Sequence, residues 1–191
     1  MNIVRALAIG IGIPSVVAIY LFTGLASTFG LQIWAAFLGW GSFFASGGTK
    51  EALLKTLAAN FWGAAWATTA LVLLAKFGSA GVPVVALIIC GTCGAMVLGT
   101  RLALLSVTLA QVYGYAATAG FGLLTGSSGL DFSLGNGPFT TVVVSMIAGT
   151  SFGYATRLSQ PARSVPDRLP DRKSRPRVAA LCDVEPLSYR P

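Results

Sequence analysis

The sequence predicts an all-α integral membrane protein with six transmembrane helices. Only 10% of the 191 residues are charged, whereas a soluble domain holds about 25%. About 20 apolar residues span a bilayer as a helix, so this composition excludes a soluble enzyme, a disordered protein and a nucleic-acid-binding protein. Five long stretches contain no Asp, Glu, Lys or Arg, namely residues 6–49, 56–75, 77–100, 102–130 and 132–156.

The first uncharged stretch is too long for one spanning helix and suits two. A break at residues 27–30 (Ser-Thr-Phe-Gly) divides it into helices at about 3–25 and 31–47. Pro14 lies inside the first of these, which membrane helices tolerate. The second ends at Gly47 and Gly48, because glycines stop helices. The alternative for the second segment is a re-entrant or broken helix.

Four more helices follow. The third begins near Glu51, whose charge suits a helix N-terminus, and runs to about residue 74. Pro83 opens the fourth, at a position where its missing N–H does no harm, and that helix ends near residue 100. The fifth covers about 103–124. After a loop rich in turn residues, the sixth covers about 139–156 and ends at Arg157.

The distribution of Lys and Arg supports this count. With six spans, twelve of the thirteen cations fall on one side of the membrane and only Lys76 falls on the other. Cytoplasmic segments carry the excess of positive charge, so we expect both termini in the cytoplasm. A cleaved signal peptide is the alternative at the N-terminus. The apolar region of a signal peptide has only about 7–15 residues, however, and the apolar run of this chain is longer.

A second region follows the transmembrane domain of residues 1–157. Residues 158–191 hold six of the nine prolines, and such a composition favours a disordered, basic cytoplasmic tail. Two interpretations remain open. The cations that follow the last helix either contact anionic lipid head groups, at about 1 kcal/mol each, or form a solvated anchor that fixes the topology.

A weak internal repeat relates the two halves of the transmembrane domain. Residues 63–67 (Gly-Ala-Ala-Trp-Ala) resemble residues 149–153 (Gly-Thr-Ser-Phe-Gly), at an offset of 86 residues. Duplication of three spans would give two copies of inverted topology, a common plan for transporters and channels. The alternative is that membrane helices rich in Gly, Ala and Phe simply look alike.

The motifs Ile-Trp-Ala-Ala-Phe-Leu-Gly-Trp (33–40), Gly-Ala-Ala-Trp (63–66) and Gly-Thr-Ser-Phe-Gly-Tyr-Ala (149–155) resemble those of a bacterial inner-membrane family, domain of unknown function 1097. The resemblance covers about residues 1–157 and implies a small multi-pass inner-membrane protein. It implies no substrate and no catalytic or binding residue. One departure is visible, because we associate a Pro-Gly pair with the fifth helix of relatives, where residues 106–110 read Ser-Val-Thr-Leu-Ala.

Polar residues inside membrane helices are the best pointers to function. Asn60 and Gln111 lie within the third and fifth predicted helices. They either line a path for a small neutral solute or join helices, at roughly 0.6–2 kcal/mol per contact. Trp40, Phe43 and Phe44 follow helical spacing and either form a constriction of this path or face lipid.

Small residues at helical spacing indicate close helix packing. They are Gly63 and Ala67, Gly91 and Ala95, and Gly149 and Gly153. We expect them to pack within one chain, with a homo-oligomer interface as the alternative. Cys90 and Cys93 form a CxxC pair in an apolar helix, where protonated thiols act as small packing residues.

The uncharged stretches that form most of each predicted span contain no Asp, Glu, Lys, Arg or His, and general acid–base catalysis requires an ionisable group. We therefore expect no enzyme activity, no metal site and no cofactor, and the lipid bilayer rather than nucleic acid as partner. The function expected is passive or weakly coupled passage of a small uncharged or weakly polar solute. The alternative is a non-transporting membrane module that assembles with itself or a partner through small-residue helix faces.

Overall fold

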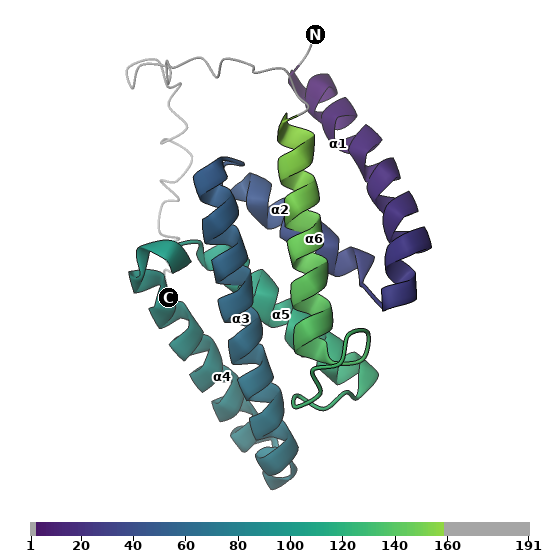
Figure 1. Cartoon of the computed structure of the whole chain (residues 1–191). Helices are drawn as coiled ribbons and strands as arrows, with labels where there is room; N and C mark the ends of the chain where they lie inside the picture. The colour runs from purple at the N-terminus through teal and green to yellow at the C-terminus, as the bar shows by residue number, and fades with distance from the viewer. Residues whose placement is uncertain (1–2, 159–191) are drawn as a thin grey trace, which may run out of the picture. The chain divides into compact units, whose positions relative to one another are not determined.

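Six α-helices make up the regular structure of residues 3–158, the part of the chain that the computed structural model describes. Side chains are described from residue 12 onward, except at residues 25 and 26. The all-helical prediction is confirmed for these residues. The predicted tail lies outside the described residues from residue 159 onward. The helices are α1 (Ile3–Leu21), α2 (Ile33–Ala45), α3 (Lys50–Phe77), α4 (Val82–Leu98), α5 (Thr108–Thr125) and α6 (Pro138–Leu158) (Figure 1).

The end of α1 changes its hydrogen-bond pattern before the chain turns. A π-helical turn at Phe22–Ala26 and a 3-10 turn at Ser27–Phe29 extend the helical path beyond the predicted end. The Thr23 hydroxyl donates to the Ile19 carbonyl at 2.6 Å. Gly30 then adopts a φ of 71°, in the left-handed region that favours glycine. The chain is thereby redirected into α2.

The α2–α3 connection is a tight turn built on two glycines. Gly47 and Gly48 have φ angles of 95° and 62°, and the Gly48 N–H donates to the Phe43 carbonyl at 3.0 Å. The Thr49 hydroxyl accepts a hydrogen bond from the Ala52 N–H at 3.1 Å and caps α3. The predicted glycine stop is therefore confirmed, and α2 is one continuous helix of 13 residues.

The predicted start of the fifth helix at residue 103 is wrong, since α5 begins at Thr108. Two 3-10 turns, Gly99–Arg101 and Ala103–Leu105, precede it. The Leu105 carbonyl accepts a hydrogen bond of 2.6 Å from the Gln111 side-chain nitrogen. In a continuous helix this carbonyl would accept from the N–H four residues later. The side-chain bond therefore stabilises the turn instead of a longer helix.

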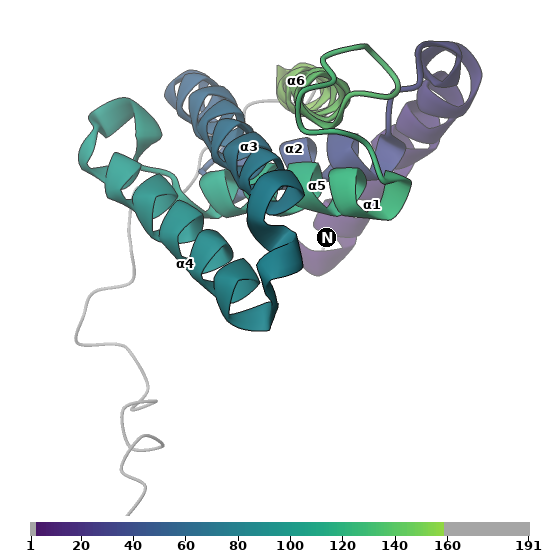
Figure 2. The ribbon, with the colours of Figure 1, turned by 90° about the horizontal axis from the view of Figure 1, so that it is seen from below.

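The helices pack as two close pairs with one flanking helix each. α3 packs against α5 and α2 packs against α6, and these are the most extensive contacts between helices. α4 lies beside α3, and α1 lies at the other side of the bundle next to α6 (Figures 1 and 2). Each close pair thus combines one helix from the first three with one from the last three.

Glycine permits the backbones of each close pair to touch. At the α2·α6 crossing, a Cβ on Gly149 would fall on the Ala36 carbonyl oxygen, and one on Gly39 would fall on the Met146 carbonyl oxygen. The α3·α5 crossing has the same arrangement, in which Gly63 meets the Gln111 carbonyl and Gly114 meets the Asn60 carbonyl. Small residues at such crossings maximise van der Waals contact between membrane helices.

At each end of the bundle, a connection between helices contacts another segment of the chain. At one end the Arg157 guanidinium donates to the Gly47 carbonyl at 3.2 Å, which joins the end of α6 to the α2–α3 turn. At the opposite end Gly30 of the α1–α2 connection lies against Gly135 of the α5–α6 loop. The start of α1 and the end of α6 lie at one end of the bundle, whereas the α3–α4 turn and the α5–α6 loop lie toward the other end (Figure 1).

The bundle has an apolar exterior, and its apolar interior also encloses a set of polar side chains. Large apolar side chains such as Val82 and Leu124 are 81% and 89% exposed. The buried polar residues are Ser42, Thr56, Asn60, Thr92, Gln111, Thr118, Thr141, Ser145 and Thr150. Soluble proteins expose mainly charged and polar residues, so this apolar surface suits a lipid environment.

Three helical segments are long and apolar enough to cross a membrane, namely Lys50–Ala80, Val82–Arg101 and Pro138–Leu158. Two shorter apolar helices, Gly12–Gly24 and Ile33–Ala45, accompany them. The length and composition of the described helices therefore support three of the six predicted spans directly.

Substitution of a crossing glycine is expected to destabilise the bundle. In Gly149→Ala the new methyl group meets the Ala36 backbone, which has no rotamer to yield. Such overpacking costs about 1–3 kcal/mol, and the thermal unfolding midpoint in detergent should fall. Gly41→Ala is the matched control, because Gly41 lies in α2 with nothing within 4 Å of its Cβ position. An equal loss of stability in both variants would contradict the close crossing.

Candidate functional site

The two residues with side-chain amides predicted from the sequence lie at the same helix crossing. Asn60 on α3 is 3% exposed and Gln111 on α5 is 0% exposed. Each lies three residues before a crossing glycine, Gly63 and Gly114 respectively, and its backbone carbonyl contacts the glycine of the other helix. The α3·α5 crossing therefore buries both amides where the two backbones come closest.

Asn60 uses its amide nitrogen to join α3 to α2. Its Nδ2 donates to the Ser42 hydroxyl at 3.3 Å, and that hydroxyl donates in turn to the Gly39 carbonyl at 2.8 Å. The Asn60 Oδ1 atom is buried and has no hydrogen-bond partner among the described residues. The amide nitrogen thus has a hydrogen-bond partner, whereas the amide oxygen has none among the described residues.

In Gln111, too, the amide nitrogen has a partner and the amide oxygen has none that the structure describes. Its Nε2 donates to the Leu105 carbonyl at 2.6 Å, and its buried Oε1 has no partner in the described part of the chain. Thr118, which follows Gly114 by one turn of α5, is fully buried and its hydroxyl is also without a partner there. Unpaired buried polar atoms are rare in native proteins, and each one asks for an explanation.

Hydroxyl groups extend this polar interior toward the α2–α3 turn. The Thr56 hydroxyl donates to the Ser46 hydroxyl at 3.0 Å, and Ser46 donates to the Ser42 carbonyl at 2.6 Å. Together with the bond from Asn60 to Ser42, these contacts form a line of polar groups between α2 and α3. The line contains no ionisable side chain, so its electrostatic character is dipolar and neutral.

The corresponding α2·α6 crossing is apolar. The residues three positions before its glycines are Ala36 and Met146, in the places that Gln111 and Asn60 occupy at the other crossing. Both are buried, at 4% and 1% exposure. The two crossings thus share a backbone arrangement but differ in chemistry, and the described structure has amides at only one of them.

The predicted aromatic residues lie along α2 and α6. Trp40 is 5% exposed and its ring packs edge-on against Phe152 at 5.5 Å. Phe43 is fully buried and packs against Tyr154 at 6.2 Å, whereas Phe44 is 38% exposed. The ring contacts of Trp40, Phe43 and Phe44 are with other aromatic residues of these two helices rather than with the amides.

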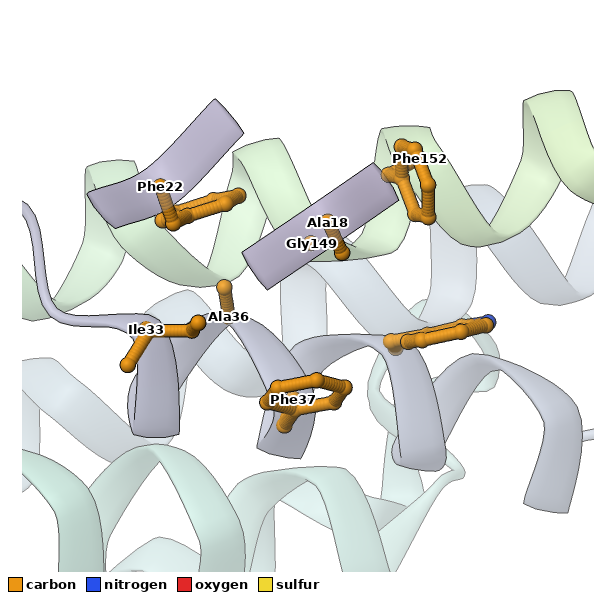
Figure 3. A pocket seen from close by; sticks show the side chains of 8 residues that line it. Ala18, Phe22, Ile33, Ala36, Phe37, Gly149 and Phe152 are labelled. Atoms are coloured by element: carbon orange, nitrogen blue, oxygen red, sulfur yellow. The ribbon is translucent and has the colours of Figure 1, made fainter. Parts of the chain in front are cut away.

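Cavities in the bundle lie against α1. One is small, about 10 Å³, and its lining atoms are apolar. Figure 3 shows Ala18 of α1 and Phe22 of the π-helical turn above Ala36 of α2. A larger open hollow of about 620 Å³ is lined by residues of the segment 16–24. Neither includes Asn60 or Gln111 in its lining, and the exposures of 3% and 0% of these residues show that the α3·α5 crossing is closed in this conformation.

The predicted packing residues divide into two groups. Gly63, Ala67, Gly149 and Gly153 lie in helix contacts within the chain: Ala67 is fully buried, and a Cβ on Gly153 would meet the Trp40 ring. On α4, by contrast, Gly91 is exposed with nothing within 4 Å of its Cβ position, and Ala95 is half-buried.

The two cysteines of the CxxC pair lie in different environments on α4. Cys90 is exposed on the outer surface of the bundle, whereas Cys93 is half-buried, and both are free thiols. Cys93 packs beside a buried cluster of α3, α4 and α5 that contains Ala67, Met96 and Tyr115. Neither cysteine lies in the polar interior. Cys182 is among the residues outside the described range.

Sequence reasoning missed several members of this site, namely Gly39, Ser42, Gly114 and Thr118. A signal was present for the two glycines, because Ala36-x-x-Gly39 and Gln111-x-x-Gly114 occur at the same offset, 75 residues. The serine and the threonine carry no such signal. Hydroxyl groups in membrane helices usually bond within their own helix, and only the packing shows which ones meet the amides.

An apolar surface, glycine-packed helix crossings and three helices long and apolar enough to cross a membrane are typical of a membrane protein, and the class of this chain is therefore a membrane-type helical protein. The chain belongs to the family described as protein of unknown function (DUF1097), whose family model matches residues 8–160. This match confirms the resemblance noted in the sequence. No curated protein and no solved structure matches the chain.

The contact between Asn60 and Ser42 is expected to couple α3 to α2. In a double-mutant cycle of Asn60→Ala and Ser42→Ala, we expect an interaction energy of about 0.6 kcal/mol and at most about 1.7 kcal/mol. Unfolding in a denaturing detergent supplies the measurement. Thr69→Ala replaces Ser42→Ala in the control cycle, because the exposed Thr69 hydroxyl bonds only to its own helix. Equal coupling in both cycles would refute the contact.

Proposed function

We propose that the chain is a six-span membrane protein built as a 3+3 inverted repeat, in which α1–α3 correspond to α4–α6. The equivalent close pairs α2·α6 and α5·α3 support this proposal. Under the offset of 86 residues, Asn60 corresponds to Met146 and Gly63 to Gly149, and both glycines perform the same packing role. An offset of 75 residues relates Ala36 to Gln111 in the same manner.

The proposed orientation has both termini in the cytoplasm of a bacterial inner membrane. In this orientation Lys50, Arg101 and Arg157, which lie at or just after helix ends, are assigned to the cytoplasmic side, in agreement with the usual excess of cytoplasmic cations. The opposite side carries Lys76 and Asp131. A Ser133 N–H at 2.8 Å from the Asp131 carboxylate lowers the pKa of that group below its usual value. The bilayer, with anionic lipid at the tail, is the partner proposed.

Reporter fusions test this orientation. Alkaline phosphatase joined after residue 79 or residue 131 should be active, because these positions are assigned to the outer side. Fluorescent protein joined after residue 48, 102 or 158 should be bright for the opposite reason. The cellular phosphatase activity and fluorescence are the measurements. Phosphatase activity after residue 158 would overturn the six-span arrangement.

The function proposed is passive or weakly coupled passage of a small uncharged solute between the two repeats. The observation that carries it is the pair of buried, half-bonded amides, Asn60 and Gln111, at the crossing where one helix of each half meets the other. Transporters built from inverted repeats place their sites at this interface. Polar groups at this depth are costly and commonly functional.

The solute that this interior suits carries no net charge. Residues 56–75 and 102–130, which include both amides, contain no acid or base. A permeating ion would therefore lack a counter-charge in a region of low dielectric constant. For the same reason we propose no enzyme activity. Because the crossing is closed in this conformation, passage requires α3 and α5 to separate.

Flux measurements test the transport proposal. Proteoliposomes that contain the full chain should swell faster than empty vesicles with glycerol or urea as the solute. Asn60→Leu and Gln111→Leu should each lower the protein-dependent rate roughly tenfold, the effect of losing about 1.4 kcal/mol of hydrogen bonding to the solute. Met146→Leu, at the equivalent apolar position, should leave the rate unchanged. A wild-type rate equal to that of empty vesicles would reject transport for these solutes.

Self-assembly without transport remains the second proposal, and α4 supplies its observation. Gly91 is exposed on this flanking helix, whereas Gly63, Gly149 and Gly153 are occupied within the chain. An interface between copies would therefore use α4 rather than the crossing glycines. Association in bilayers that is lost in Gly91→Leu, together with absence of flux, would favour this alternative.

A further inference from the structure

We propose that the α3·α5 crossing binds a small neutral solute through the solute's own N–H or O–H donors, with Asn60 Oδ1 and Gln111 Oε1 as the acceptors. The site proposed favours a solute that donates, because both amide oxygens lack a partner among the described residues, whereas each amide nitrogen already donates one hydrogen bond. This inference rests on the proposed function for the passage of the solute but not for its binding.

The orientation of both amides follows from the atoms that hold them. A reversed Gln111 amide would place Oε1 beside the Leu105 carbonyl oxygen, at the 2.6 Å that now separates Nε2 from it. Two acceptors at that distance repel each other. The amide nitrogen is therefore directed to Leu105, and the oxygen is the atom that remains for a ligand.

The same reasoning applies to Asn60. The Ser42 hydroxyl gives its proton to the Gly39 carbonyl at 2.8 Å, so toward Asn60 it acts as an acceptor. Only the amide nitrogen of Asn60 satisfies it. Each amide is consequently held by its nitrogen, and each presents its carbonyl oxygen.

Burial without a hydrogen-bond partner is energetically unfavourable for these two oxygens. Asn60 is 97% buried and Gln111 is fully buried, on the exposures of 3% and 0%, and neither oxygen has a partner among the described residues. Lipid supplies no donor at this depth. A molecule that brings N–H or O–H groups removes this penalty, whereas a molecule that only accepts hydrogen bonds leaves it in place.

The two crossings also restrict the site to one location. Ala36 and Met146 occupy the equivalent positions of the α2·α6 crossing and offer no side-chain acceptor of this kind. The proposed class is therefore small primary amides, ureas and polyols, bound once per chain. Cations are disfavoured because residues 56–75 and 102–130 contain no carboxylate.

Pairs of isomers test the role of donors at constant size. Propionamide and N-methylacetamide have the same formula but two and one N–H bonds; butyramide and N,N-dimethylacetamide have two and none. The full chain, carrying ¹³C in its glutamine side-chain carbonyls and reconstituted in bilayers, is titrated with each compound. The chain has only three glutamines, and subtraction of the Gln111→Met spectrum isolates the Gln111 carbonyl band in the infrared.

We expect a saturable shift of this band to lower wavenumber with propionamide and butyramide, a smaller shift with N-methylacetamide and none with N,N-dimethylacetamide. Met146→Leu should retain these shifts. Equal responses to the two members of each pair would overturn the proposal. So would a band that already lies at the hydrogen-bonded position without solute and does not respond to propionamide, which would identify a structural water only.

The comparison of isomers uses the unaltered chain, so it does not depend on the folding of Gln111→Met; Asn-labelled protein gives a second reading at Asn60. Flux of the same compounds separates the two proposals. A donor-dependent band shift without flux upholds binding and rejects transport. Flux that is equal for isomers with and without N–H bonds, together with equal band responses, upholds transport and rejects this site.

Discussion

Close contact between helix backbones is the constraint on which the rest of this structure depends. In lipid, helices gain little from burying apolar side chains against one another, so association relies on van der Waals packing and hydrogen bonds. Four glycines, Gly39, Gly63, Gly114 and Gly149, bring α2 to α6 and α3 to α5. The positions of the flanking helices and of the polar interior follow from these two crossings.

The close approach of the helix backbones also determines the environment of the two amides. Asn60 and Gln111 stand one helical turn before a crossing glycine and are therefore enclosed on all sides. Their side chains are too short to reach the membrane surface as a lysine or arginine does. They bind the nearest available groups, a serine hydroxyl and the carbonyl of a 3-10 turn. Packing geometry thus decides the hydrogen bonding, and the hydrogen bonding determines which atoms remain open.

Much of the secondary structure was predictable because bilayer thickness and helix rise together limit the length of an uncharged segment. Five of the six helices begin within about two residues of their predicted starts, in line with the usual uncertainty of helix boundaries. α5 is the exception, because two 3-10 turns precede it and the Gln111 side chain bonds to the Leu105 carbonyl there, an arrangement that the hydropathy of the segment does not indicate. The unpaired oxygens were unpredictable for the same reason, whereas the burial of Asn60 and Gln111 followed from their position in apolar segments.

The pairing of helices across the two halves has a consequence for biogenesis. Neither α2 nor α3 finds its close partner within the first three helices, since those partners are α6 and α5. In the six-span arrangement proposed above, the first half therefore enters the bilayer during synthesis with the glycine faces of α2 and α3 facing lipid. These faces are covered only after the ribosome has delivered the second half. The folding unit is consequently the whole bundle, and a single three-helix half is an incomplete intermediate that membrane quality control would recognise.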